Sequence, residues 1–425
     1  MLSPAAIAES RAGLSEIESE YIARSLLREA PTVAPHQTND EVMQLLSERS
    51  DVVSLPVVEN GLPIGLINRN IFMDGIAKPF RRELFGRKSC IAFMDKQPLV
   101  VSEHMSIQEL SFKVVGAGGK TLNDGFVITD DAGLYLGVGT GEDLVKIVTH
   151  LQAEKNRLVM ESINYASVIQ KSFLRASRED MAAALHDYFI HWEPRDKVGG
   201  DYYFCKKFED GFFIALIDCT GHGVPGAFMT LIMASFLDHI LLEDNRRDPA
   251  GALAMMNRKV KIALGQIGEH NIVPIEGQRF AHSPDKEQSD DGMDTAFCWV
   301  ESCKLIYAGA KTPLFTLENG ATEVTVIEGD RKGVGYVDTP MDYTWTNKEI
   351  ALSKGMRVYL TTDGIIDQIG GTKDIAFGKK RFCNLLVENS ELPLVAQKER
   401  IMQAFYTYQG KQRRRDDVSL LGFRI

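Results

Sequence analysis

Two aspartates that lie close together in the sequence suggest the chemistry. Asp201 follows Gly199-Gly200 and precedes Tyr202-Tyr203-Phe204, a strand pattern. Asp218 ends the apolar run Phe212–Ile217, which is typical of a buried strand, and glycines follow it. If these strands pair as a hairpin, both carboxylates reach one rim of a sheet. Adjacent carboxylates repel each other unless a cation lies between them, and oxygen-only ligands favour Mg²⁺ or Mn²⁺.

Either acid alone is weak evidence, because a Gly-Gly-Asp triplet is usually a turn and Asp218 could cap the helix predicted over 227–242. Two further acids lie at strand ends. Asp363 follows the strand pattern Met356–Thr362 and precedes a glycine, and Asp416-Asp417 precedes a final strand that begins at Val418. Caps and turns do not readily explain four such acids in one segment, so they predict a metal site.

Four segments, in chain order, carry a resemblance to a known family: Val198-Gly199-Gly200-Asp201-Tyr202, Asp218-Cys219-Thr220-Gly221-His222-Gly223, Thr362-Asp363-Gly364 and Asp416-Asp417-Val418-Ser419. They resemble the metal-dependent (type 2C, PPM) Ser/Thr protein phosphatases, and in particular the bacterial SpoIIE/RsbU branch. The resemblance covers residues 177–425. It implies an αββα sandwich of two antiparallel sheets, with the site in a cleft at one end.

The resemblance also implies roles for single residues. Asp218 would bridge two Mn²⁺ or Mg²⁺ ions, and Asp201 and the Cys219 carbonyl would ligate one of them. Asp363 and Asp416 would ligate the other, with Asp417 as the alternative to Asp416. Asp218 and Asp363 are thus the catalytic residues that the resemblance implies.

A hydrolytic mechanism follows from such a site. Two divalent ions about 3.5–4 Å apart bring the pKa of a shared water near neutrality, and the hydroxide attacks phosphorus in line. No nucleophilic Ser or Cys is required. His222 only loosely matches a catalytic histidine of eukaryotic relatives, and we favour a structural role between its glycines. Arg195 is either a phosphate contact or, as we favour, a solvated loop charge.

Composition narrows the class of protein. The chain has 425 residues, enough for two or three domains, and its net charge of −10 argues against a nucleic-acid-binding surface. Six cysteines without a CxxC pair predict reduced thiols. The apolar helix over 227–242 is expected to be too short and polar to span a bilayer, and the N-terminus lacks a signal-peptide pattern. We therefore expect a cytoplasmic protein.

The N-terminal part shows an internal repeat. Residues 1–30 predict an amphipathic helix, and two copies of about seventy residues follow over 31–150. Each copy has the order strand, helix, strand, turn, strand, helix, and the pair resembles tandem cystathionine β-synthase (CBS) domains, which implies an adenine nucleotide between the copies. Gly137–Asp143 fits the family's Gly-x-x-Thr-x-x-Asp pattern, so Thr140 and Asp143 are the candidate ribose contacts. The alternative is that both residues cap a helix.

A helix is predicted from Glu142 to about His191, a stretch without Gly or Pro. We assign residues 151–190 to a helical linker and 191–425 to the phosphatase domain. An apolar stripe on the linker indicates either coiled-coil dimerisation or packing against its own domains. Our hypothesis is that this helix controls the Gly199-Gly200-Asp201 turn and with it one metal ligand.

Three further segments allow two interpretations each. The basic insert Lys78–Lys88 is a solvated loop or a binding element. The polar loop Gln266–Asp291 is a substrate-facing flap or a tolerated insertion. Lys411–Arg415 attracts phosphate or an acidic partner, or compensates the charge of Asp416-Asp417, which we favour. Ile306–Phe315 resembles a family segment beside the cleft, and we expect it to shape substrate access.

The sequence therefore predicts an α+β protein with an αββα phosphatase sandwich, an α/β CBS pair and a helical linker. The leading hypothesis is a phosphoserine/phosphothreonine protein phosphatase of a bacterial partner-switching pathway. The resemblance implies a phosphorylated STAS-domain anti-sigma-factor antagonist as substrate, and we expect a homodimer. The alternative is a non-catalytic adenine-nucleotide-sensing scaffold. A nucleotide cyclase, suggested by Gly199-Gly200-Asp201, would leave Asp363 and Asp416 unexplained.

Overall fold

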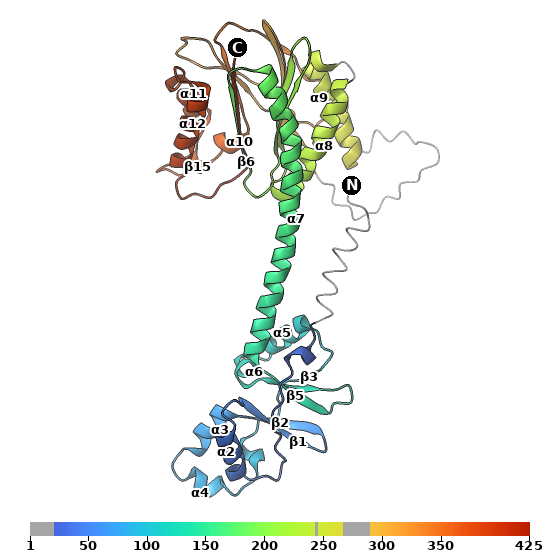
Figure 1. Cartoon of the computed structure of the whole chain (residues 1–425), viewed down its shortest axis with the longest axis vertical. Helices are drawn as coiled ribbons and strands as arrows, with labels where there is room; N and C mark the ends of the chain where they lie inside the picture. Colours follow the sequence, from blue (N-terminus) through green and yellow to red (C-terminus); the bar gives the residue numbers. More distant parts are fainter. Residues whose placement is uncertain (1–20, 243–244, 267–289) are drawn as a thin grey trace, which may run out of the picture. The chain divides into compact units, whose positions relative to one another are not determined.

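The computed structural model describes residues 21–242, 245–266 and 290–425, and the chain divides into two compact units, Met1–Met160 and Glu161–Ile425 (Figure 1). Each unit has its own hydrophobic core. Residues 1–20 of the predicted N-terminal helix and most of the Gln266–Asp291 loop lie outside the described residues. Within the rest of that predicted helix, Ala23–Leu26 forms a 3-10 turn.

The N-terminal unit contains two copies of one element order. The first copy comprises α2 (Asn39–Glu48), β1 (Ser54–Glu59), β2 (Leu62–Asn68) and α3 (Arg69–Ile76). After α4 (Arg81–Phe85), the second comprises β3 (Val100–Ser102), α5 (Ile107–Gly116), α6 (Gly119–Asp124), β4 (Phe126–Thr129) and β5 (Tyr135–Gly139). In both copies a leading extended segment pairs in parallel with the next strand: Val33 bridges Val57, and β3 pairs with β4. The predicted repeat is thus visible in the strand pairing.

Helix α7 runs from Gly141 to Ala184, and the prediction of helix up to about His191 is wrong at its end. Tyr188–Glu193 forms strand β6, which pairs with the C-terminal strand. Aromatic and β-branched side chains such as Phe189 and Ile190 favour a strand, and this long-range pairing decides the conformation. The last turns of α7 also belong to the C-terminal unit, because Leu174 and Met181 are buried in its core.

Two five-stranded antiparallel sheets form the centre of the C-terminal unit. The first has the order β13 (Lys348–Ala351), β10 (Lys304–Ala310), β9 (Met293–Glu301), β8 (Phe212–Cys219) and β7 (Asp201–Lys207). The second has the order β12 (Thr325–Ile327), β11 (Leu314–Leu317), β14 (Arg357–Thr361), β17 (Val418–Arg424) and β6. Small elements follow β14: α10 (Asp363–Ile366), β15 (Ile369–Gly370) and β16 (Ile375–Ala376).

Helices cover the outer faces of both sheets (Figure 1). Helices α8 (Gly223–Leu242) and α9 (Pro249–Leu264) pack on the first sheet, and α11 (Lys379–Glu388) and α12 (Leu394–Gln409) lie over the second. Between the sheets, the rings of Phe212 and Phe423 meet edge to face at 6.0 Å. Because both faces of each sheet are covered, strands such as β8 are apolar throughout instead of alternating. The predicted α+β class and αββα sandwich are confirmed.

Helix α8 corrects one expectation. Over Gly223–Leu241 it is long and apolar enough to span a membrane by length and composition alone, although we expected it to be too short and polar. Half of this apolar stretch is buried, and Met233, Leu237 and Ile240 pack into the core of the C-terminal unit. A core helix covered by a sheet and by α9 has the same composition as a spanning helix.

The burial of Met181 gives a stability test. We expect Met181→Ala to lower the free energy of unfolding of the C-terminal unit by about 2–4 kcal/mol, because the shorter side chain leaves a cavity in the core. The exposed neighbour Glu179 provides a control, and Glu179→Ala should change it by less than about 0.5 kcal/mol. Urea unfolding followed by tryptophan fluorescence measures both. Equal stability of the two variants would show that the end of α7 is not part of this core.

Candidate metal centre

Three aspartates lie side by side at one end of the first sheet. The strands β7 and β8 form the predicted hairpin, with Asp201 directly opposite Asp218. The next strand continues the row, because Asp218 pairs with Asp294 of β9. Directly opposed residues of antiparallel strands present their side chains on the same face. The sequence analysis missed Asp294, although an acid just after the Gly292 turn was a signal.

The second sheet brings further acids to the same place. Asp363 begins α10 directly after β14, and Asp416 precedes the neighbouring strand β17. The Thr362 hydroxyl donates to Asp201 Oδ2 at 2.8 Å and so ties the two sheets together. One cavity is lined by acids from both sheets, together with two lysines: Asp218, Asp294, Asp363, Asp367, Lys311 and Lys379.

These carboxylates influence each other's ionisation. Burial raises the pKa of Asp218 well above its usual value, and the charges of Asp201, Asp363, Asp416 and Asp294 raise it further. Burial and then Asp416 raise the pKa of Asp363 to about 6. Crowded carboxylates of this kind fit a hard cation, which would relieve their repulsion.

The acids are neighbours but do not form a closed cage. No three Asp, Glu, His or Cys side chains of the described residues converge closely enough to hold an ion as they stand. The ligand set Asp201, Asp218, Cys219, Asp363 and Asp416 therefore stays a prediction.

Glycines bring two backbone segments into contact beside these acids. Cys219 N donates to Gly200 O at 3.0 Å. A Cβ atom on Gly200 would lie 2.5 Å from Gly221 O and 2.7 Å from Cys219 O, so only glycine fits. The Cys219 carbonyl thus lies beside the Gly-Gly-Asp turn. Burial raises the pKa of the Cys219 thiol well above its usual value, which leaves the thiol unreactive.

Asp417 holds the Gly-Gly-Asp turn through both of its carboxylate oxygens. Oδ1 accepts from Arg195 N and Oδ2 accepts from Gly200 N, each at 2.6 Å. The buried carboxylate is thereby occupied by backbone amides. This geometry favours Asp416 over Asp417 as the ligand and makes Asp417 a positioning residue.

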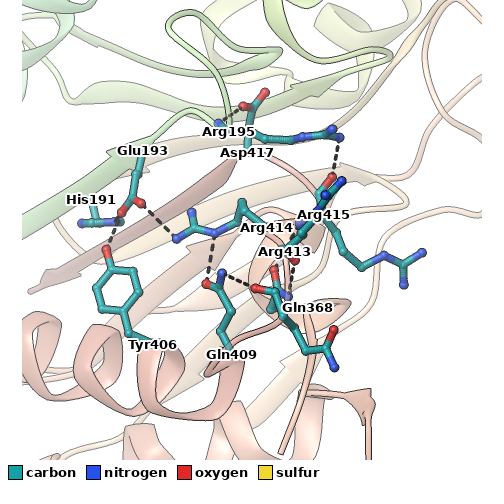
Figure 2. Close-up of polar contacts among 11 residues, drawn as sticks. His191, Glu193, Arg195, Gln368, Tyr406, Gln409, Arg413, Arg414, Arg415 and Asp417 are labelled. Atoms are coloured by element: carbon teal, nitrogen blue, oxygen red, sulfur yellow. Dashed lines mark hydrogen bonds and ion pairs between the residues drawn. The ribbon is translucent and has the colours of Figure 1, made fainter. Parts of the chain in front are cut away.

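The two other side chains considered for catalysis make structural contacts. His222 is half exposed, and its Nδ1 lies 3.0 Å from Asp196 Oδ2. The Arg195 guanidinium donates to the Arg415 carbonyl at 3.0 Å (Figure 2). Neither residue lines the cavity between the acids.

The basic run Lys411–Arg415 is partly structural (Figure 2). Arg414 Nη2 lies 2.9 Å from Glu193 Oε1, and its guanidinium covers the rings of Phe405 and Tyr406. Gln368 bridges the Arg413 carbonyl and the Arg415 amide. Arg414 therefore compensates Glu193 of β6, not Asp416-Asp417 as we expected of this run.

In the N-terminal unit, Thr140 and Asp143 form a helix cap. Thr140 Oγ1 donates to Asp143 Oδ2 at 2.7 Å and accepts from Asp143 N at 3.2 Å. Arg28 also pairs with this carboxylate. Thr140 and Arg28 line a cavity with Ser54 and Asp124, which come from different repeats. A nucleotide at this cavity stays a prediction.

Comparisons with known proteins define the class. Residues 209–425, just over half of the chain, match the family described as Stage II sporulation protein E (SpoIIE), and residues 23–78 match the CBS domain. The C-terminal unit is thus a PP2C-type Ser/Thr protein phosphatase domain. The chain belongs to the SpoIIE family and carries an N-terminal CBS domain. A comparison with curated protein sequences gives no match.

The first of three solved structures agrees with this assignment. The chain is similar to the SiaA-PP2C domain of Pseudomonas aeruginosa, with 33% identity and a TM-score of 0.54, over 64% of this chain and 99% of that one. The RsbU and RsbW domains of Rv1364c from Mycobacterium tuberculosis match with 16% identity and a TM-score of 0.43, over 57% of this chain and 60% of that one. The PP2C phosphatase domain of SpoIIE from Bacillus subtilis matches with 14% identity and a TM-score of 0.42, over 56% and 62%.

Repulsion among the acids predicts a pH-dependent cost in metal-free protein. The pKa of Asp363 is raised in the folded state to about 6, so the folded protein binds more protons and loses stability as the pH rises from about 4 through 6. In EDTA at pH 7.5, we expect Asp363→Asn to raise the free energy of unfolding by about 1 kcal/mol, a value reduced by the side chain's partial exposure.

Urea unfolding at pH 4 and pH 7.5 measures this effect. The gain should vanish at pH 4, and the exposed Asp342→Asn should show no gain at either pH. A variant Asp363→Asn that is less stable than wild type at both pH values would contradict the assigned repulsion.

Proposed function

We propose that the protein is a Mn²⁺- or Mg²⁺-dependent phosphoserine/phosphothreonine protein phosphatase of a bacterial partner-switching pathway. Its substrate is a phosphorylated STAS-domain anti-sigma-factor antagonist or a similar small regulator, and its CBS pair controls its activity in the cytoplasm. The observation that supports catalysis most strongly is the row Asp201, Asp218, Asp294 beside Asp363. Membership of the SpoIIE family supports the substrate class.

Each residue of the site then has a distinct task. Asp201, Asp218, Asp363, Asp416 and the Cys219 carbonyl would hold two ions. Bound divalent ions supply a water-derived nucleophile at neutral pH and offset the charge on the phosphoryl oxygens. Thr362 orients Asp201, and Asp417 fixes the turn that carries it. No side chain has to act as a covalent nucleophile.

A contact between α7 and the Gly-Gly-Asp turn supports control through the helix. The Gln170 side chain is 1% exposed and hydrogen-bonds to both backbone polar groups of Gly199. Its Nε2 donates to Gly199 O at 2.7 Å, and its Oε1 accepts from Gly199 N at 3.3 Å. Nε2 also donates to Thr230 of α8 at 3.0 Å. A shift of α7 would therefore move the turn that ends at the proposed ligand Asp201.

Two further proposals concern the rest of the chain. Apolar side chains on α7 are exposed, with Val159 at 53%, Tyr165 at 62% and Val168 at 61%, which supports a homodimer formed through this helix. The cavity at Thr140 supports adenine-nucleotide binding by the CBS pair. The alternative function, a nucleotide-sensing scaffold without catalysis, accounts less well for the complete set of acids.

Catalysis is tested with p-nitrophenyl phosphate in Mn²⁺. We expect Asp218→Ala and Asp363→Ala to lower kcat/KM at least about 100-fold, because loss of a ligand costs no less than loss of the residues that orient ligands. His222→Ala should retain activity within about twofold, since this side chain lies outside the cavity. Equal rates for wild type and both aspartate variants would contradict the proposed mechanism.

Control through the turn is tested with Gln170→Ala. Loss of the Gly199 contacts should raise the Mn²⁺ concentration needed for half-maximal activity by about tenfold, because the affected turn carries one ligand. The control is Lys171→Ala, which changes the exposed neighbour on α7. Manganese titrations of both variants give the answer. If Gln170→Ala needs the same Mn²⁺ concentration for half-maximal activity as wild type, the contacts of α7 with the turn do not influence the metal centre.

A further inference from the structure

The cavity between the acids is lined by two lysines that have different partners. Lys379 lies 2.9 Å from both carboxylate oxygens of Glu328, so its charge is already paired. Lys311 follows the end of β10 and lines the cavity with Asp218 and Asp363. The segment Ile306–Phe315, expected to shape substrate access, contains Lys311, but the proposed function gives this side chain no task of its own.

The backbone of Lys311 is held in an unfavourable conformation. Its φ of +62° lies in the left-handed region, which costs about 1–2 kcal/mol for a residue with a Cβ atom. The Lys311 amide donates to Asp330 O at 2.8 Å, and the preceding residue Ala310 bridges the same segment. Strain that the surrounding structure maintains beside a cluster of acids indicates a functional position.

Two contacts hold the Lys311 ammonium at the wall of the cavity. Nζ lies 3.1 Å from Asp294 Oδ1 and 4.2 Å from the centre of the Tyr336 ring. Asp294 is in turn directly opposite Asp218 in the sheet, so the positive charge lies beside the central acid. An ammonium group has three N–H donors, and the contact with Asp294 leaves donors for a second anion.

We propose that Lys311 binds the phosphate group of the substrate, an inference that rests on the proposed function. A phosphate monoester dianion that enters this cavity meets Asp218, Asp294, Asp363 and Asp367. Two divalent ions would only neutralise the four proposed carboxylate ligands. Lys311 adds a positive charge and hydrogen-bond donors on the side of Asp294, where they face the phosphoryl oxygens.

The test compares Lys311→Met and Lys311→Arg with the control Lys354→Met, which changes an exposed lysine outside the cavity. For Lys311→Met we expect KM for p-nitrophenyl phosphate and the dissociation constant of inorganic phosphate, measured by calorimetry in Mg²⁺, to rise about tenfold together. Lys311→Arg should recover most of the loss, and Lys354→Met should stay within about twofold of wild type. The Mn²⁺ affinity, measured by electron paramagnetic resonance, should be unchanged in all three.

Phosphate affinity in Lys311→Met that equals wild type would overturn the proposal. So would a loss that follows a weaker Mn²⁺ affinity, because Lys311 would then support Asp294 and the metal centre instead of the substrate. If wild type shows no turnover, the proposed function fails, but the calorimetric comparison of phosphate binding still decides the role of Lys311.

Discussion

The mutual repulsion of closely spaced carboxylates is the constraint on which the C-terminal unit depends. The pairing of β7, β8 and β9 fixes Asp201, Asp218 and Asp294 in one row, and the neighbouring sheet adds Asp363. A folded protein accepts such a cluster only at a cost in stability, which raised pKa values such as that of Asp363 reflect. A bound cation would relieve this repulsion, and the free energy recovered would add to the affinity of the site for the cation. The sandwich is the rigid frame that prevents the acids from separating.

The glycine turn before Asp201 is the part of this frame on which we propose that regulation acts. It is held from two sides, by Gln170 of α7 and by Asp417 beside the last strand. Both side chains are buried and bind backbone groups, so each helps to fix the position of Asp201, and the charge of Asp417 adds to burial in raising the pKa of Asp201. Because Gln170 lies on the helix that begins after the second predicted repeat, we propose this helix as the physical route for regulation.

The sequence predicted the features that depend on local patterns. Acid-glycine motifs at strand ends, apolar strands and the repeat order all follow from neighbouring residues, and the hairpin of Asp201 and Asp218 was among them. Features decided by distant partners were missed. Tyr188–Glu193 became a strand because β17 is available to pair with it, and Asp294, Lys311 and Gln170 gain their roles only through contacts across the fold. The partly exposed pairing of Arg414 with Glu193 likewise could not be predicted from a run of basic residues.

We propose that acids from two sheets hold a pair of hard cations. Anomalous diffraction from crystals of the full chain grown with Mn²⁺ tests it most directly. We expect two manganese peaks in the cavity, with the Asp218 carboxylate between them and Asp201 and Asp363 on opposite sides. Well-ordered acids with no manganese peak at saturating Mn²⁺, or peaks ligated only by other residues, would contradict it.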